Sequence, residues 1–229
     1  MNQLPDRTAK RYFFRFNAEE VNAAKRDLAA IFKPVIEQTK AHSAIVYGAD
    51  RQTDEFRAVA ARSAIAPRIP ELGVTIGEEG TAILRRTTEP FHATRVGDDR
   101  FANLPECLQY GVRNLLIFPL RAEDRVLGFL TLGRTSDEPF EDTAIAAALP
   151  VAHVATAVLE RDALQIALKE RKLVERAKGV LQRRRRLSEE EAYNLLRDQS
   201  RRARRAMVDV AQEILNQAQS SKPALLKNA

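Results

Sequence analysis

The 229-residue chain has one cysteine, Cys107, no tryptophan and three histidines. A single thiol cannot form an intrachain disulfide or a thiolate metal cluster, which excludes a disulfide scaffold and a zinc ribbon. With four tyrosines and ten phenylalanines, the core must be mostly aliphatic. His153 lies among apolar residues, where a packed histidine is the expectation, so we predict no metal site and no catalytic residue.

Long apolar runs are also missing from the sequence. A bilayer-spanning helix needs roughly 20 apolar residues, and the longest candidates, 115–120 and 144–151, are much shorter. Charged residues are scattered through the first 16 positions, which therefore lack the apolar core of a signal peptide. These absences predict a cytoplasmic protein without a membrane segment.

Positive charge is concentrated at one end of the chain. Residues 161–229 contain 17 Lys and Arg but only 9 Asp and Glu, a net charge of +8, whereas residues 1–160 carry a net charge of −2. Clustered basic side chains attract phosphates over about a Debye length. The asymmetry predicts a polyanion-binding module that follows a nearly neutral domain.

The first 140 residues alternate between helical and strand patterns, which indicates an α+β domain. Residues 19–38 have helical spacing of apolar side chains, and 43–47 and 56–61 read as a hairpin. The glycine-containing segment 73–80 precedes a short helix at 81–86. The densely apolar segment 112–133, with a turn at 122–125, predicts central strands of an antiparallel sheet that packs under helices.

From Phe140 to about Arg186 the pattern is helical, and Pro150 either opens a helix or kinks one long helix. Apolar residues recur at every seventh position, which predicts a coiled-coil seam for dimerisation formed by Leu159, Ile166, Leu173 and Val180. Ser188 and Glu191 have the spacing of a capping box, so a new helix begins there, and another covers 207–215.

Three segments of the basic end match a known family. They are 175–181 with an Ala-Lys-Gly turn at 177–179, 187–197 with Ala192 and Tyr193 before Leu196 and Arg197, and 208–215. Together they resemble the ANTAR domain, a three-helix module of bacterial transcription antiterminators, over roughly residues 165–216. Gln182 and Ser200 depart from the family pattern but are similar in size to the usual residues.

The preceding residues resemble a GAF domain, a sensory module that is commonly fused upstream of ANTAR. The resemblance lies in 77–80 before a short helix, 114–120, 128–133 and the segment Pro139-Phe140-Glu141-Asp142. We therefore expect an N-terminal extension (1–18), a GAF-like domain (19–160), a coiled-coil helix with a three-helix ANTAR domain (161–217), and a flexible tail (218–229).

The resemblance implies a non-enzymatic regulator of transcription antitermination. Such proteins act as homodimers in which each module binds one of two paired stem-loops in nascent leader RNA, so that a terminator cannot form. A small-molecule effector at the GAF-like domain is implied, but the sequence does not identify it and indicates no cofactor. Some GAF relatives use a thiol pair or a bilin-bearing Cys-His, whereas Cys107 is single and precedes Leu108.

RNA binding requires cations for phosphates and planar groups for bases. The basic side chains that we expect to contact phosphates are Lys178, Arg183, Arg184, Arg185, Arg186, Arg197, Arg201 and Arg204. Tyr193 shares a helix face with Arg197. Its ring either stacks on a base or packs in the domain core, and the sequence supports both readings.

Two other functions are compatible with the basic helices. A DNA-binding regulator would place them in a major groove, although no helix rich in base-reading Asn or Gln stands out. A non-catalytic dimerisation or adaptor protein would show no salt-sensitive binding of nucleic acid at all. Competition between hairpin RNA and duplex DNA distinguishes these alternatives from antitermination.

Overall fold

The computed structural model describes residues 18–50, 55–65, 73–74, 76–94, 99–101 and 103–220. The chain divides into two compact units, Met1–Glu160 and Arg161–Ala229. Nearly all of the expected N-terminal extension and most of the expected tail lie outside the described residues.

An antiparallel sheet forms the N-terminal unit, with the strand order β3-β2-β1-β6-β5-β4. The strands are β1 (Ser43–Ala49), β2 (Phe56–Ser63), β3 (Gly73–Val74), β4 (Phe91–Thr94), β5 (Asn114–Ala122) and β6 (Arg125–Arg134). The predicted strands 112–133 are confirmed as β5 and β6, which pair with each other and have further partners on their outer sides.

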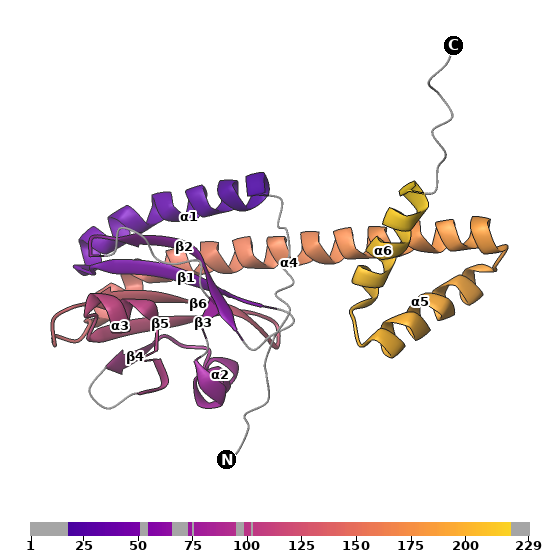
Figure 1. Ribbon diagram of the computed structural model, residues 1–229. Coiled ribbons are helices and arrows are strands. Elements are labelled where there is room, and N and C mark those ends of the chain that lie inside the picture. Colours follow the sequence, from indigo (N-terminus) through magenta and orange to yellow (C-terminus); the bar gives the residue numbers. More distant parts are fainter. Residues whose placement is uncertain are drawn as a thin grey trace, which may run out of the picture. The chain divides into compact units, whose positions relative to one another are not determined.

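Helices cover both faces of this sheet (Figure 1). One face carries α1 (Ala18–Thr39) and the start of α4 (Asp142–Arg185), and the other carries α2 (Gly77–Arg86), the 3-10 helix Asp99–Phe101 and α3 (Pro105–Tyr110). Alternate residues of a strand point to opposite faces, so Leu130 packs under α1 and α4 while Phe129 packs under α2 and α3. This explains why the central strands are apolar throughout.

A buried polar cluster lies within the α2 and α3 side of the sheet. Glu106 of α3 is almost completely buried, and its carboxyl group accepts hydrogen bonds from the Tyr47 hydroxyl (2.5 Å) and the Thr131 hydroxyl (2.9 Å). Burial raises the pKa of Glu106, although these hydrogen bonds oppose the shift. Burial and the neighbouring Glu106 also raise the pKa of Tyr47. Cys107 is buried in the same cluster.

The N-terminal unit differs from the sequence prediction in two helices. The helix predicted at 81–86 begins earlier, at Gly77, whose φ of +70° suits glycine at a sharp entry into α2. Pro150 does not open a helix but lies inside α4, which is 44 residues long.

The expectation that no apolar stretch approaches membrane-spanning length is wrong for α4. This helix contains an 18-residue window with a mean hydropathy of 1.5 and at most two charged residues. Ala148, Val151, Ala155 and Leu159 of α4 pack in the core against the sheet. One third of that window is buried, so core packing accounts for part of its apolar composition.

Three helical segments form the C-terminal unit: the end of α4, α5 (Glu189–Ala203) and α6 (Met207–Ser220). Their shared core includes Ala177, Leu181, Ala192, Leu196 and Leu215. Two expectations are wrong here. The Ala-Lys-Gly segment is helical and not a turn, and the first residues of the expected tail, up to residue 220, continue α6.

Candidate nucleic-acid interface

The arginine run lies at the C-terminal end of α4. Arg183, Arg184 and Arg185 occupy its last turn, Arg186 follows with a φ of +55°, and all four are exposed. Cations at a helix C-terminus are stabilised by the helix dipole. Arg184 donates a hydrogen bond to the Ala218 carbonyl oxygen (2.8 Å) in the last turn of α6. The other three have no acidic partner among the described residues, so their guanidinium groups are accessible to phosphates.

A second group of predicted residues lies along α5. Tyr193 is 42% exposed, and Arg197, Arg201 and Arg204 are exposed as well. Residues four apart in a helix share a face, so Tyr193, Arg197 and Arg201 follow one another along α5, and Arg204 caps its end with a φ of +51°. The core contacts of this helix come from Ala192, Leu195 and Leu196. Of the two readings of Tyr193, the structure therefore shows an accessible ring outside the core.

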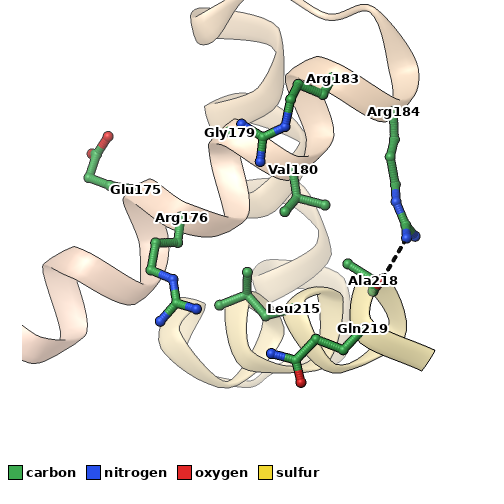
Figure 2. Close-up of a pocket in the computed structure, with 9 residues that line it drawn as sticks. All are labelled: Glu175, Arg176, Gly179, Val180, Arg183, Arg184, Leu215, Ala218 and Gln219. Carbon is green, nitrogen blue, oxygen red and sulfur yellow. Dashed lines mark hydrogen bonds between the residues drawn. The ribbon is translucent and has the colours of Figure 1, made fainter. Parts of the chain in front are cut away.

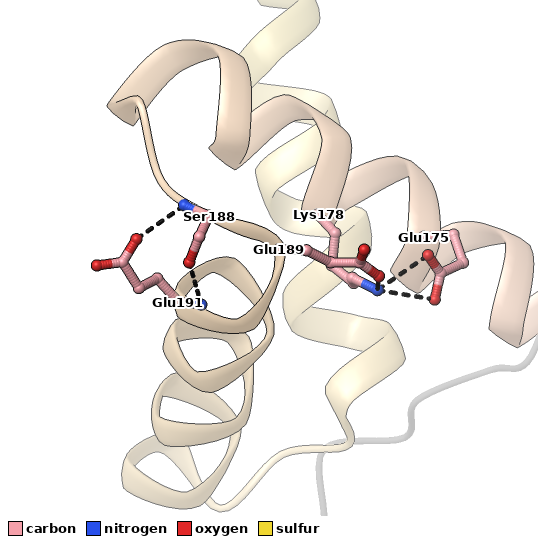
Figure 3. A network of polar contacts seen from close by, with 5 residues as sticks. All are labelled: Glu175, Lys178, Ser188, Glu189 and Glu191. Atoms are coloured by element: carbon pink, nitrogen blue, oxygen red, sulfur yellow. Dashed lines mark hydrogen bonds and ion pairs between the residues drawn. The ribbon is translucent and has the colours of Figure 1, made fainter.

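Lys178 is placed differently from the arginines. Its side chain is only 9% exposed, and its Nζ donates to Glu175 (3.0 Å) and to Glu189 (2.7 Å) in the first turn of α5 (Figure 3). The hydrogen bonds with these carboxylates raise the pKa of Lys178, and the ion pair lowers the pKa of Glu189. Lys178 thus joins α4 to α5, and we leave it out of the candidate interface.

The capping box predicted at the start of α5 is confirmed beside this ion pair (Figure 3). The Glu191 amide donates to the Ser188 hydroxyl (3.2 Å), and the Ser188 amide donates to the Glu191 carboxylate (2.7 Å). These hydrogen bonds lower the pKa of Glu191. Two otherwise unpaired backbone donors are satisfied, which fixes the start of the helix that carries Tyr193.

The predicted dimer seam occupies several environments. Leu159 is buried in the core of the N-terminal unit, whereas Leu173 and Val180 pack against the core of the C-terminal unit. Ile166 is half-buried. The seven-residue repeat therefore reflects, in large part, packing within one chain. Within the C-terminal unit, the exposed large apolar side chains of α4 are Leu164 (60%) and Leu168 (53%).

Sequence reasoning missed a groove between α4 and α6, of about 670 Å³. Arg176 and Gly179 of α4 line it together with Leu215 and Gln219 of α6 (Figure 2). Arg176 and Arg183 are seven residues apart in α4 and thus on one face. This spacing is the signal in the sequence that could have revealed the groove. No group of three or more His, Cys, Asp or Glu side chains that could hold a metal ion occurs in the described part of the chain.

Comparison with protein families assigns both units. The GAF domain model matches residues 26–159, more than half of the chain, and the ANTAR domain model matches residues 162–215. The chain belongs to the GAF family and carries an ANTAR domain. An ANTAR domain marks a family of RNA-binding antitermination regulators, and a GAF domain is a sensory module. Both domain types are regulatory and non-catalytic.

Solved structures agree with the GAF assignment at the level of the fold. A GAF domain from a phosphoenolpyruvate-protein phosphotransferase of Coxiella burnetii is 19% identical, with a TM-score of 0.53 over 66% of this chain and 92% of that chain. The phycocyanobilin-bound GAF domain of a cyanobacterial phytochrome is 10% identical, with a TM-score of 0.50 over 64% of this chain and 93% of that one. No curated protein matches the chain.

The ANTAR segment contains both groups of accessible arginines. The run at the end of α4 and the α5 residues Tyr193 to Arg204 lie inside the matched range, as do Arg176 and Gly179 of the groove. The accessible positive charge described above therefore belongs to the domain that defines the RNA-binding family.

Proposed function

We propose that the protein is a transcription antitermination regulator whose ANTAR domain binds paired stem-loops in nascent leader RNA. Binding holds the leader in a form that prevents the terminator hairpin, so that transcription continues. The proposal rests chiefly on the ANTAR domain's accessible arginines, among which Arg183, Arg185 and Arg186 have no carboxylate partner in the described residues.

The two arginine groups suit different parts of a folded RNA. Guanidinium groups bind phosphates through paired N–H donors, which fits the arginine run of α4. Tyr193 beside Arg197 offers a flat ring next to a cation, an arrangement that stacks on an unpaired base and holds its phosphate. Duplex stems need the first kind of contact and loops need both.

Two copies of the chain bind the two hairpins in this proposal. Leu164 and Leu168 lie four residues apart on α4 and expose large apolar side chains. Burying them against the same residues of a second copy removes apolar surface from water, which favours association. We therefore propose Leu164 and Leu168 as part of the dimer contact. Leu159 and Ile166 are left out, because Leu159 is buried in the GAF core and Ile166, two residues from each leucine, lies on the other side of the helix.

Helix α4 gives the GAF domain a covalent route to the ANTAR domain. It contributes residues to the core of each, Ala155 to the first and Ala177 to the second. An effector that prefers one arrangement of the GAF domain would shift the population of α4 arrangements and thereby RNA binding. A small-molecule effector for the GAF domain is part of this proposal. Inserting a few residues at Glu170 should separate sensing from binding.

A competition experiment tests the proposal. The full chain is titrated against a fluorescent RNA with two tandem hairpins, taken from a library with randomised loops after selection for binding. Unlabelled RNA of the same sequence and duplex DNA of equal length then compete. We expect RNA to displace the probe at much lower concentration than DNA, and binding to weaken steeply with salt.

Other results contradict the proposal. Equal or better competition by duplex DNA identifies a DNA-binding regulator, and the absence of any salt-sensitive binding identifies an adaptor. A variant with Tyr193→Ala tests whether the exposed ring contributes to RNA binding. It should weaken RNA binding while leaving the thermal stability nearly unchanged, because the ring lies outside the core.

A further inference from the structure

The groove between α4 and α6 has a polar wall on one side and an apolar floor. Arg176 and Arg183 reach into it from α4, and Leu215 and Gln219 face them from α6 (Figure 2). Val180 adds to the apolar part. Its volume, about 670 Å³, falls in the range of about 300 to 1,000 Å³ that is common for sites that hold small molecules.

The charge of the groove favours an anionic ligand. Three of its lining residues are arginines, and the single acidic one, Glu175, has its carboxylate bound by Lys178. Arg184 closes one side through its hydrogen bond to Ala218. Arg176 and Arg183 keep their guanidinium groups free of carboxylates within the described residues, so they can bind phosphate or lie flat on a planar ring.

Gly179 is the residue of this groove that folding does not explain. It lies inside α4, where glycine weakens a helix more than any residue except proline. Its φ is not positive, and a Cβ built on it would meet only the Arg183 Nη1 atom at 3.6 Å, an ordinary contact distance. An alanine would therefore fit and strengthen the helix. The missing side chain leaves room over the helix backbone for the Arg183 guanidinium and for a flat ligand against which that guanidinium can lie.

We propose that this groove holds one unpaired nucleobase of the bound RNA loop. The base lies against the backbone at Gly179 and the side chains of Val180 and Leu215, and its neighbouring phosphates contact Arg176 and Arg183. The Gln219 amide can donate and accept hydrogen bonds at the base edge. This inference rests on the proposed RNA-binding function and adds to it a site for a single base, separate from the Tyr193 face of α5.

The test uses the full chain, a selected two-hairpin RNA, and a set of RNAs in which each loop nucleotide in turn is made abasic. Gly179→Val fills the groove, and Gly179→Ala partly fills it while improving helix propensity. Ala167→Val is the matched control, because it adds a similar volume at an exposed position of α4 outside the groove.

We expect Gly179→Val to weaken binding of the parent RNA by about tenfold, the scale of one lost base contact. One abasic position should weaken wild-type binding by a similar factor but should not weaken the Gly179→Val variant further. Gly179→Ala should melt at a higher temperature than the wild type and still bind RNA more weakly. Ala167→Val should bind like the wild type.

Several results overturn the inference while the proposed function stands. The first is that Gly179→Val binds the parent RNA as tightly as the wild type does. The second is that every abasic RNA binds the wild type like the parent RNA. The third is that Gly179→Val weakens binding of every abasic RNA by the same factor. If Gly179→Val fails to fold, unchanged binding by Gly179→Ala contradicts the inference in its place. A wild-type protein that binds no hairpin RNA overturns the proposed function itself and with it the inference.

Discussion

Replacing the arginine run of α4 should change the salt dependence of RNA binding by a calculable amount. Each neutralised phosphate adds about 0.7 to 0.9 to the slope of log affinity against log salt. The exposed arginines of the proposed interface are Arg183, Arg184, Arg185, Arg186, Arg197, Arg201 and Arg204. If each contacts one phosphate, the slope is about −5 to −6 for each bound hairpin.

Changing the four residues from Arg183 to Arg186 to alanine should reduce that slope to about −2 to −3. Between about 50 and about 200 mM salt, the wild type should then lose about 50 to 150 times more affinity than the variant does. Fluorescence anisotropy with a labelled hairpin RNA at several salt concentrations measures both slopes.

A lysine variant of the same four positions is the control. It keeps the charge and should keep the slope, while the loss of paired N–H donors lowers its affinity. Thermal melting of each variant checks that loss of the contact between Arg184 and Ala218 has not unfolded the domain. A slope in the alanine variant equal to that of the wild type would show that the run faces solvent and would refute the reasoning.

Three further predictions concern stability and assembly. Lys178→Met keeps the apolar stem but loses the ion pairs with the two glutamates, so the ANTAR domain should melt a few degrees lower while its salt slope is unchanged; a flatter slope would indicate a phosphate contact. Because the pKa of Glu106 is raised in the folded state, the native protein holds a proton that the unfolded chain releases as pH rises above the ordinary glutamate range. The free energy of unfolding should therefore fall with pH up to that raised pKa, and denaturant titrations of Glu106→Gln should lack this decrease; parallel curves would contradict it. Leu164→Gln combined with Leu168→Gln should shift sedimentation toward the monomer, whereas Gln165→Ala should not; an unchanged dimer would exclude these leucines from the contact.

Local sequence signals were sufficient for most of the fold. The apolar density of β5 and β6 identified central strands, because both of their faces are covered. The spacing of Ser188 and Glu191 identified the start of α5, because a capping box depends on residues only three apart.

Contacts between distant segments account for the errors. An apolar residue at every seventh position fits a coiled coil, but it equally fits a helix face that packs on the domains of its own chain. Only the fold shows that Leu159 packs in the core of its own domain. Lys178 was predicted to contact phosphate because the sequence does not show that Glu189, from another helix, comes close enough to form an ion pair with it. The turn at Gly179 was expected from the family resemblance, and the long helix α4, which continues through this residue, overrides glycine's preference for turns.

The groove was missed for a related reason. Arg176 and Arg183 share a face of α4 by their spacing, but the opposite side of the groove comes from Leu215 and Gln219 of α6. The pairing of α4 with α6 depends on the shared core of the ANTAR domain, which includes Leu181 and Leu215. A single helix pattern does not contain that information.

The central claim is that the ANTAR domain binds folded leader RNA in the cell. Crosslinking the protein to RNA in its host, followed by sequencing of the recovered fragments, tests it most directly. We predict fragments that contain two adjacent hairpins upstream of a terminator, and their loss when Arg183 to Arg186 are changed to alanine. Recovery of no RNA above background, or of fragments without paired hairpins, would contradict the claim.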